Sequence, residues 1–403
     1  MSLPLSGVRV LDFSRVLAGP FATMILGDLG ADVVKVEPPQ GDDTRYWSPP
    51  EIRGIAAYFL STNRNKRSIV IDLKKPESRL VVERLAKWAD IVVENFRPGV
   101  AERLGIDYAT LSRINPKIIY CSISGFGQTG PYREKPAYDL IIQALSGHMS
   151  ITGEPGRPPV KFGVPITDLT SGMMAVIAIL AALHQREKTG VGQYIDVSML
   201  DTQVYLLVNQ AYNYFATGRD PERLGSAHPN IAPYQVFTTS DGYVAVAVGN
   251  DKLWVDFCKA LGRQDLLENP RFKTNELRVT NRRELVEEIE KIFSRMTTSE
   301  VVELLERAGV PCGPVKKISE VLSDPQVLHR GMVTKMRHPV YGEVPALGVP
   351  LKSSVTGFEI RRAPPLKGEH TREVLREVGF TDEEIESLIA MGVVETERSE
   401  KNP

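Results

Sequence analysis

The chain has 403 residues, enough for two domains, because single hydrophobic cores stop growing at about 250 to 300 residues. Its 49 Lys and Arg residues nearly balance its 50 Asp and Glu residues, which gives no global electrostatic reason to bind nucleic acid or an anionic membrane. Hydrophobic residues make up 42% and charged residues 25% of the chain, as in soluble globular proteins.

The cysteines and the apolar runs indicate the compartment. Cys121, Cys258 and Cys312 are widely spaced and form no CxxC motif, so neither a disulfide framework nor a zinc site is expected. No apolar run approaches the roughly 18 residues of a membrane span, and the first residues lack the charged and apolar regions of a signal peptide. We expect a cytoplasmic protein without a metal site and without a membrane partner.

The first half of the chain alternates short apolar strands with helices. Strands are expected at 8–13, 32–37, 68–73, 90–95 and 118–124, and helices at 18–29, 76–88 and 100–104. This alternation predicts an α/β fold with a Rossmann-like, doubly wound parallel sheet. The first turn, Ser14-Arg-Val-Leu-Ala-Gly-Pro, is not GxGxxG, so hydride transfer with a nicotinamide cofactor loses most of its support.

Glycines and basic residues follow several of these strands. The loop Gly125-Phe-Gly-Gln-Thr-Gly-Pro either forms a tight turn that needs positive φ or cradles a phosphate. The basic residues near strand ends are Lys66, Arg67, Arg97, Arg103 and Lys135. They are either solvated surface charges or ligands for the phosphates of a nucleotide-like cofactor.

Asp168 stands between an extended apolar run and a helix. Residues 173–183 are apolar on nearly every face, which predicts a helix buried all round. Asp168, like Thr167, Thr170 or Ser171, is suited to cap this helix. A carboxylate near the positive end of a helix also stays ionised at neutral pH and is available as a nucleophile. Both interpretations can hold together.

The character of the chain changes after a strand at 194–199 and a helix at 201–215. A hairpin around 240–242 and charged helices, among them an amphipathic one at 282–295, predict a smaller α+β domain at 226–330. The large domain then comprises 1–225 and 331–403. Its tail, with a strand-like stretch at 342–350 and a helix at 382–391, is suited to pack back on that domain.

Several motifs together resemble one known family. They are Arg15-Val-Leu-Ala-Gly-Pro, Gly41-Asp-Asp-Thr-Arg, Asn63-Arg-Asn-Lys-Arg-Ser, Glu94-Asn-Phe-Arg-Pro-Gly, the Gly125 loop, Tyr138-Asp139 and Thr167-Asp168-Leu. The chain resembles the class III CoA-transferases from about Leu5 to Met391, a superfamily with formyl-CoA transferases, carnitine CoA-transferases and α-methylacyl-CoA racemases. The loop at 225–235 and Pro325-Gln-Val-Leu-His are most similar to the branch that moves CoA from succinyl-CoA to a dicarboxylate such as glutarate.

The resemblance implies an interlocked homodimer and a catalytic aspartate at Asp168. The implied CoA contacts are Arg15, Val16, Leu17, Ala18, Asn95, Phe96, Arg103 and Tyr138. A basic residue near Pro38 and a lysine near Pro136, which some members have, are missing here. The CoA thioester is a substrate, its partner is a small carboxylic acid, and the family implies no metal and no permanently bound cofactor.

The implied chemistry needs donors for oxyanions and an anchor for a second carboxylate. Backbone N–H groups of Gly125, Gly127 and the loop that begins at Gly225 are suited to stabilise oxyanions. The candidate anchors for a dicarboxylate are Arg45, Arg15 and His228.

Two alternatives to a CoA-transferase stay open at this point. An α-methylacyl-CoA racemase needs an acid and a base on opposite faces of the α-carbon, and its active-site histidine falls at Tyr138, a poor base at neutral pH. A non-catalytic CoA-binding α/β protein would share the fold.

Overall fold

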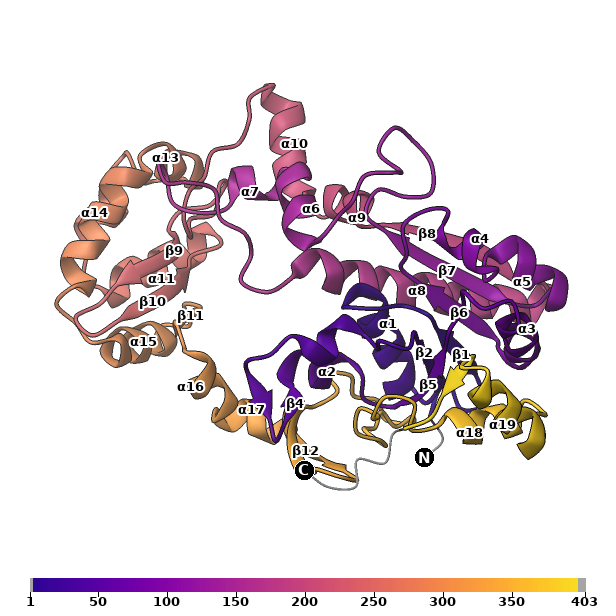
Figure 1. The fold of residues 1–403 in the computed structure, drawn as a ribbon. Helices are drawn as coiled ribbons and strands as arrows, with labels where there is room; N and C mark the ends of the chain where they lie inside the picture. Colours follow the sequence, from indigo (N-terminus) through magenta and orange to yellow (C-terminus); the bar gives the residue numbers. More distant parts are fainter. Residues whose placement is uncertain (1–2, 398–403) are drawn as a thin grey trace. The chain divides into compact units, whose positions relative to one another are not determined.

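The computed structural model describes residues 3–397 and divides into two units (Figure 1). Within this range, residues 3–148, 162–208 and 325–397 form the larger unit, and residues 149–161 and 209–324 form the smaller one. The smaller domain was expected at 226–330, so its predicted start lies 17 residues after the observed one and its predicted end lies 6 residues after it. The sequence analysis did not predict that residues 149–161 belong to the smaller unit.

The larger unit is built on a seven-stranded sheet with the order β14-β5-β2-β1-β6-β7-β8. The strands are β1 (Arg9–Asp12), β2 (Asp32–Glu37), β5 (Lys66–Ile71), β6 (Ile91–Glu94), β7 (Ile119–Ser124), β8 (Gln193–Ser198) and β14 (Val394–Glu395). Six of them are parallel, and β14 runs antiparallel to β5. The α/β class is confirmed, with a mixed, mostly parallel sheet. Apolar residues dominate these strands because helices cover both faces.

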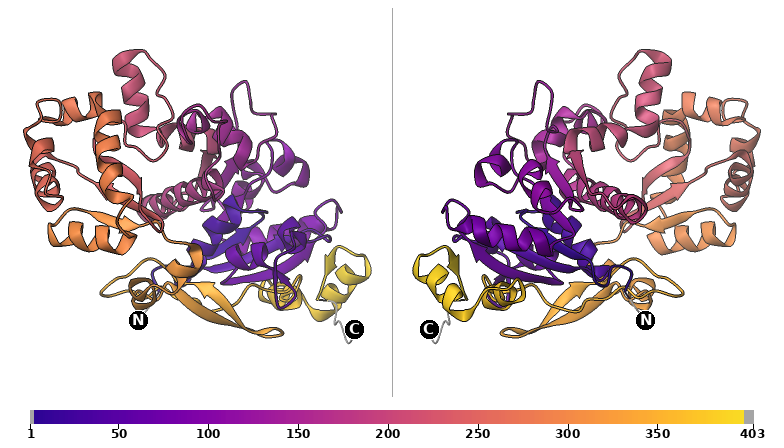
Figure 2. Two further views of the ribbon diagram at one scale, coloured as in Figure 1. Left: turned by 90° about the vertical axis from the view of Figure 1, so that its left-hand side faces the viewer. Right: turned by 90° about the vertical axis from the view of Figure 1, so that its right-hand side faces the viewer.

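Two hydrophobic cores lie on the two faces of this sheet. One face is covered by α3 (Ser78–Trp88), α5 (Tyr108–Ile114), α18 (Thr371–Glu377) and α19 (Asp382–Ala390), and the other by α1 (Ala18–Asp28) and α8 (Ile166–Thr189). The tail packs back on the larger unit, as predicted: α18 and α19 lie beside the sheet edge formed by β5 and β14 (Figure 1). The strand-like stretch of the tail is β13 (Gly342–Leu347), which pairs with β12 (Val333–His338) in a separate ribbon (Figure 2).

Helix α8 is not buried all round, and this part of the prediction is wrong. Ala175 and Ile179 face the core, whereas Met173, Ile177 and Leu180 are exposed. Within residues 3–397, α8 is also the one helix long and apolar enough, by length and composition, to cross a membrane, which corrects the statement that no apolar run approaches that length. A core helix passes the same test, and one face of α8 packs against α1 here.

The smaller unit holds a three-stranded antiparallel sheet with the order β11-β10-β9. Strands β9 (Tyr234–Thr238) and β10 (Tyr243–Ala247) form the predicted hairpin, and β11 (Cys312–Pro314) pairs with β10. Its main helices are α11 (Asp251–Ala260), α14 (Arg282–Phe293) and α15 (Thr298–Arg307). Helix α14 buries Leu285, Ile289 and Phe293, one apolar side of the predicted amphipathic helix.

The remaining elements are short. They are η1 (Asp43–Tyr46), β3 (Glu51–Ile52), β4 (Ile55–Ala56), α2 (Ala57–Thr62), α4 (Val100–Leu104), α6 (Asp139–Leu145), α7 (His148–Ile151), α9 (Met199–Tyr205), α10 (Val208–Thr217), α12 (Gln264–Glu268), α13 (Asn275–Thr280), α16 (Ile318–Leu322) and α17 (Pro325–His329). The single helix predicted at 201–215 is therefore two helices, α9 and α10.

Candidate active site

Asp168 lies in the first turn of α8, but it does not cap that helix. The residue before the helix is Pro165, which has no capping side chain. Asp139 of α6 accepts the backbone N–H of Thr167 at 2.9 Å and its hydroxyl at 2.9 Å. The capping role considered for Asp168 thus belongs to another carboxylate, which leaves Asp168 available for chemistry.

The position of Asp168 depends on a close approach of α8 to α1. The backbone N–H of Ala18, the first residue of α1, lies close enough to the Asp168 carboxylate to lower its pKa. One turn further along α8, a Cβ on Gly172 would lie 2.8 Å from the carbonyl oxygen of Ala18. Glycine is required there, since a larger residue would push the two helices apart and move Asp168 away from the N–H.

The electrostatic surroundings raise the pKa of Asp168 to about 7. Burial is the largest cause, the negative charge of Asp139 adds to it, and the Ala18 N–H opposes both. The expectation of a fully ionised carboxylate at neutral pH is therefore wrong for the unliganded site. The helix terminus favours the charged form, but desolvation and a like charge outweigh it. Poorly solvated carboxylates are also stronger nucleophiles once ionised.

Asp168 lines a cavity of about 370 Å³ at the carboxyl ends of neighbouring strands. The lining comes from the turn after β1, the loop after β6 and the glycine loop after β7, and these strands are adjacent in the sheet. Ligands of open α/β sheets bind in this place. The basic residues in the lining are Arg15, Arg97, Arg133 and Lys135. The cavity is therefore suited to anionic ligands.

Most of the predicted site residues line this cavity together with Asp168. They are Arg15, Val16, Ala18, Asn95, Phe96, Gly125 and Tyr138. Among the described residues, the lining does not include Leu17, Arg103 or Gly127. The predicted contacts of Leu17 and Arg103 with CoA stay predictions. Leu17 is buried at the start of α1.

The side chain of Asn95 has a clear structural task. Its Oδ1 accepts the backbone N–H of Arg15 at 2.8 Å, and its Nδ2 donates to the carbonyl of the same residue at 2.8 Å. Asn95 therefore ties the loop after β6 to the turn after β1. The two loops that line the cavity are held at a set distance by one amide group.

The glycine loop is only partly available as an oxyanion site. The N–H of Gly127 donates to Ser124 Oγ at 3.0 Å, so it is already used, against the expectation. At Gly125 a Cβ would lie 2.3 Å from the Cβ of Ala137, so the loop packs closely there. Its carbonyl accepts the N–H of Leu200 at 3.0 Å.

Arg45 does not reach this cavity and is not a dicarboxylate anchor. Its Nε and Nη2 donate to Glu37 at 2.8 Å and 2.6 Å, and its Nη1 donates to the carbonyl of Pro365 at 3.1 Å. These bonds occupy the guanidinium within the fold. His228 belongs to the smaller unit, where burial and then the charge of Arg282 lower its pKa. Its Nδ1 accepts the N–H of Asn230.

Lys66 and Arg67 are also excluded as phosphate ligands. Lys66 is buried in β5 and pairs with Asp12 at 3.0 Å, and Arg67 pairs with Asp32 at 2.6 Å and with two glutamates of α18. The sequence analysis missed Arg133 in the cavity, and Lys35 and Asp42 behind the first turn. A signal for Lys35 existed: a lysine within a strand buried on both faces must have a partner.

Fold and cavity together define an α/β protein with a cavity at the carboxyl ends of its parallel strands, lined by four basic residues and by the buried Asp168. The chain matches the family model for CoA-transferase family III over residues 5–371. It belongs to that family and is a CoA-transferase.

Relatives and solved structures agree with this assignment. The chain is 45% identical over 394 residues to the succinyl-CoA:glutarate CoA-transferase of Mus musculus, covering 97% of this chain and 90% of that protein. It is 45% identical over 382 residues to the succinate–glutarate CoA-transferase of Agrobacterium fabrum, covering 93% and 96%. The crystal structure of a CAIB/BAIF family protein from Brucella suis aligns with a TM-score of 0.84 and 44% identity, covering 94% of this chain and 100% of that one.

Proposed function

We propose that this CoA-transferase moves CoA from succinyl-CoA to a dicarboxylate such as glutarate, with Asp168 as the nucleophile. The observation that carries this proposal is a carboxylate free of capping bonds that lines a cavity rich in cations. The names of the relatives in mouse and Agrobacterium fabrum support the choice of donor and acceptor.

The reaction proceeds through two covalent intermediates on Asp168. The ionised carboxylate attacks the thioester carbonyl, which releases the CoA thiolate and leaves a mixed anhydride. The thiolate then attacks the aspartyl carbonyl, which forms an aspartyl-CoA thioester and releases succinate. The acceptor carboxylate reverses both steps and leaves as its CoA thioester. Each step exchanges one acyl bond for another, so no electrons are gained or lost.

The cavities of the larger unit support the binding of a long ligand such as CoA. A second cavity, of about 410 Å³, shares Arg15 and Phe96 with the cavity of Asp168. We propose that CoA extends across both, with its phosphates near Arg97, Arg133 and Lys135. Lys135 stands next to the position where some family members have a lysine, and its Nζ lies 3.5 Å from the centre of the Tyr132 ring.

Of the three predicted anchors for a second carboxylate, Arg15 is the one that lines the cavity of Asp168. Its side chain is about half exposed, and its guanidinium lies 3.5 Å from Asp43. A bound dicarboxylate would compete with that weak surface pair. We therefore propose Arg15 as the anchor.

The racemase alternative lacks its active-site histidine. Among the described residues, the lining of the cavity contains no histidine, and Tyr138 is an exposed residue at the start of α6. Turnover of a 2-methylacyl-CoA in D₂O should therefore give no enzyme-dependent deuterium at the α-carbon. Deuterium incorporation at the rate of turnover would instead support a racemase.

Membership of an enzyme family argues against the second alternative, a non-catalytic CoA-binding protein.

We also propose the interlocked homodimer in the cytoplasm that the sequence analysis predicts. Helices α6, α8 and α9 pack together, and each exposes large apolar side chains: Leu140, Ile141, Leu145, Met173, Ile177, Leu180, Val204 and Tyr205. Large exposed apolar side chains gathered on helices that pack together favour an interface. Sedimentation at nanomolar concentration should show two chains per particle, and a wild-type monomer would contradict the proposal.

Ile177→Glu should reduce the fraction of dimer. Gln185→Glu, on an exposed position of the same helix, should leave that fraction unchanged.

The nucleophile itself is tested by trapping. Wild-type enzyme is incubated with succinyl-CoA without acceptor, treated with hydroxylamine and digested with trypsin. Mass spectrometry should find a hydroxamate on the peptide of Asp168. The peptide of Asp139 serves as an internal control, because Lys161 lies between the two residues. Absence of any adduct on Asp168 would refute the nucleophilic role.

A further inference from the structure

The turn from Ser14 to Leu17 has an unfavourable backbone conformation. Val16 has φ of +67°, in the left-handed region that β-branched residues rarely adopt. Two residues further along the chain, the backbone N–H of Ala18 lowers the pKa of Asp168. A strained segment persists only where the surrounding structure holds it in place, and such segments cluster at active sites.

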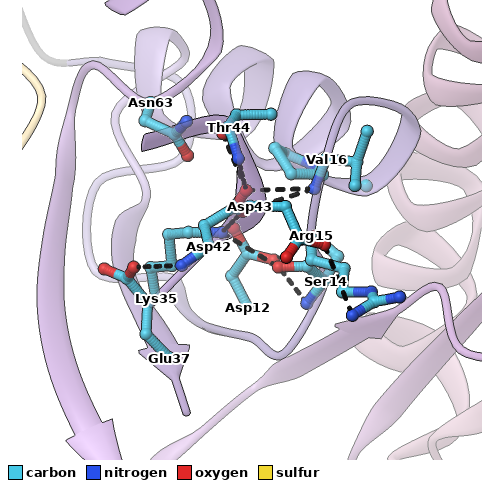
Figure 3. Close-up of polar contacts among 12 residues, drawn as sticks. Asp12, Ser14, Arg15, Val16, Lys35, Glu37, Asp42, Asp43, Thr44 and Asn63 are labelled. Atoms are coloured by element: carbon cyan, nitrogen blue, oxygen red, sulfur yellow. Dashed lines mark hydrogen bonds and ion pairs between the residues drawn. The ribbon is translucent and has the colours of Figure 1, made fainter. Parts of the chain in front are cut away.

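A buried ion pair holds this turn from behind (Figure 3). The Asp42 carboxylate lies 3.3 Å from the backbone nitrogen of Val16 and accepts its N–H. Lys35 Nζ donates to Asp42 at 2.8 Å and to the carbonyl of Ser14 at 2.9 Å. Both side chains are almost fully buried. The pair therefore binds the backbone on either side of Arg15, whose own N–H and carbonyl are bound by Asn95.

Further side chains keep the pair in place. Thr44 donates its N–H and its hydroxyl to Asp42 at 2.9 Å and 2.7 Å. Lys35 and the other bonds lower the pKa of Asp42, and Asp42 is the largest of the influences that raise the pKa of Lys35 against burial. Both groups are thus charged at neutral pH.

We propose that Asp42 and Lys35 are positioning residues of the transfer reaction, which hold the turn in the shape that presents the Ala18 N–H to the Asp168 carboxylate. This inference rests on the nucleophilic role proposed for Asp168. The Ala18 N–H favours the ionised form of Asp168, so a relaxed turn leaves a smaller fraction of the nucleophile ionised.

Several other charged or titratable groups lie near Asp168, and of these Arg15 belongs to the turn itself. They are Asp139 of α6, Tyr58 of α2, and Tyr138, Arg15, Arg97, Arg133 and Lys135 in the cavity lining. Removal of the Asp42 charge by itself takes a negative charge from this region, which lowers the pKa of Asp168. Relaxation of the turn raises that pKa. The two effects have opposite signs, which makes Asp42 the residue to change.

Two variants separate position from charge. Asp42→Asn keeps the shape of the side chain but has one acceptor oxygen, whereas both oxygens of Asp42 are used. Its NH₂ group must therefore face Lys35 or the Val16 N–H. Asp42→Glu keeps the charge beside Lys35 but moves the carboxylate by one methylene. The matched control is Asp28→Asn at the other end of α1, where the buried Asp28 pairs with Arg64 at 2.7 Å.

The readout is the acid limb of kcat/KM for succinyl-CoA between pH 5 and 9, because this limb reports the ionisation of the free enzyme. The ionisation of CoA itself is common to all variants. Both Asp42 variants should move the limb to higher pH by about half a unit to one unit, which is about a three- to tenfold loss at pH 6 and a smaller loss at pH 9. Asp28→Asn should leave the limb in place even if it lowers Tm.

The outcomes are distinguishable. An upward shift in Asp42→Asn, against the direct effect of its lost charge, supports the positioning role, and Asp42→Glu provides the same test if the amide variant does not fold. If the wild type forms the adduct on Asp168, and the acid limb of a folded Asp42 variant stays in place or moves to lower pH, this inference alone is overturned. If the wild type forms no adduct, the proposed function fails and this inference fails with it.

Discussion

Asp42 and Asp168 lie beside one stretch of backbone, from Val16 to Ala18, and yet their pKa values move in opposite directions. Asp42 accepts the N–H of Val16 and has a buried lysine beside it, so its pKa is lowered. Asp168 is buried near another carboxylate, Asp139, so its pKa rises to about 7 although the N–H of Ala18 opposes the rise. One N–H group does not outweigh desolvation, whereas a lysine together with several donors does. The paired carboxylate stabilises the fold, and the unpaired one is available for the attack that we propose.

The largest expected effect comes from removing the unpaired carboxylate. Asp168→Ala should reduce transfer by about 10⁴-fold or more, since the covalent route is lost. Asp168→Glu should reduce kcat by about 10²-fold, because a displacement of about 1 Å misplaces the nucleophile. Steady-state assays with succinyl-CoA and glutarate measure both. Asp201→Ala, an exposed aspartate in the first turn of α9, is the control, and near-normal activity of Asp168→Ala would contradict the mechanism.

The paired and unpaired carboxylates should differ in their effect on stability. Asp12 pairs with buried Lys66, so Asp12→Asn should destabilise the fold by about 3 to 5 kcal/mol and lower Tm. Asp168→Asn should leave Tm unchanged or raise it, because it removes a charge that is desolvated and repelled. Calorimetry of the two variants and of the wild type measures both changes in Tm. A large loss of Tm in Asp168→Asn would show that its carboxylate has a structural partner.

Two arginines extend the comparison from carboxylates to cations. Arg15→Gln should raise KM for the dicarboxylate about tenfold and leave Tm nearly unchanged, because this side chain lines the cavity and is half exposed. Arg45→Gln should lower Tm with KM unchanged, because it leaves Glu37 buried without its partner. Similar KM values in wild type and Arg15→Gln would place the anchor elsewhere, with His228 as the next candidate.

The smallest effects concern pH. Asp168 binds its proton up to about pH 7 in the folded state but only to about pH 4 when unfolded, so its ionisation removes stability as pH rises through this window. The Tm of Asp168→Asn should therefore exceed the Tm of the wild type by more at pH 8 than at pH 5. For Asp42 the sign is opposite, because its stabilisation is complete above its ordinary pKa and is lost in acid.

The same argument predicts the effect of Asp139 on activity. Asp139→Asn removes the like charge that helps to raise the pKa of Asp168, so the acid limb of kcat/KM should move to lower pH. The amide oxygen can still accept the N–H of Thr167, so α8 should begin at the same residue. A limb that stays near pH 7 would show that burial alone sets the ionisation of Asp168.

Much of the architecture was predictable because it depends on neighbours along the chain. Apolar strands that alternate with helices predicted the α/β fold, and the motifs from Arg15 to Asp168 identified the family. The carboxyl ends of parallel strands meet at one edge of a sheet, so the cavity at that edge was predictable as well.

The sequence by itself determined the strands, the family and the place of Asp168 at the start of a helix, because periodicity and helix-start signals act over a few residues. Only the tertiary structure decided which charges are paired. Arg45 and Arg15 look alike in the sequence, but one is bound to Glu37 and the other lines the cavity. Likewise, Asp139 and not Asp168 caps α8, and burial beside Asp139 raises the pKa of Asp168. Pairing and desolvation depend on groups brought together from distant parts of the chain, and no local pattern records them.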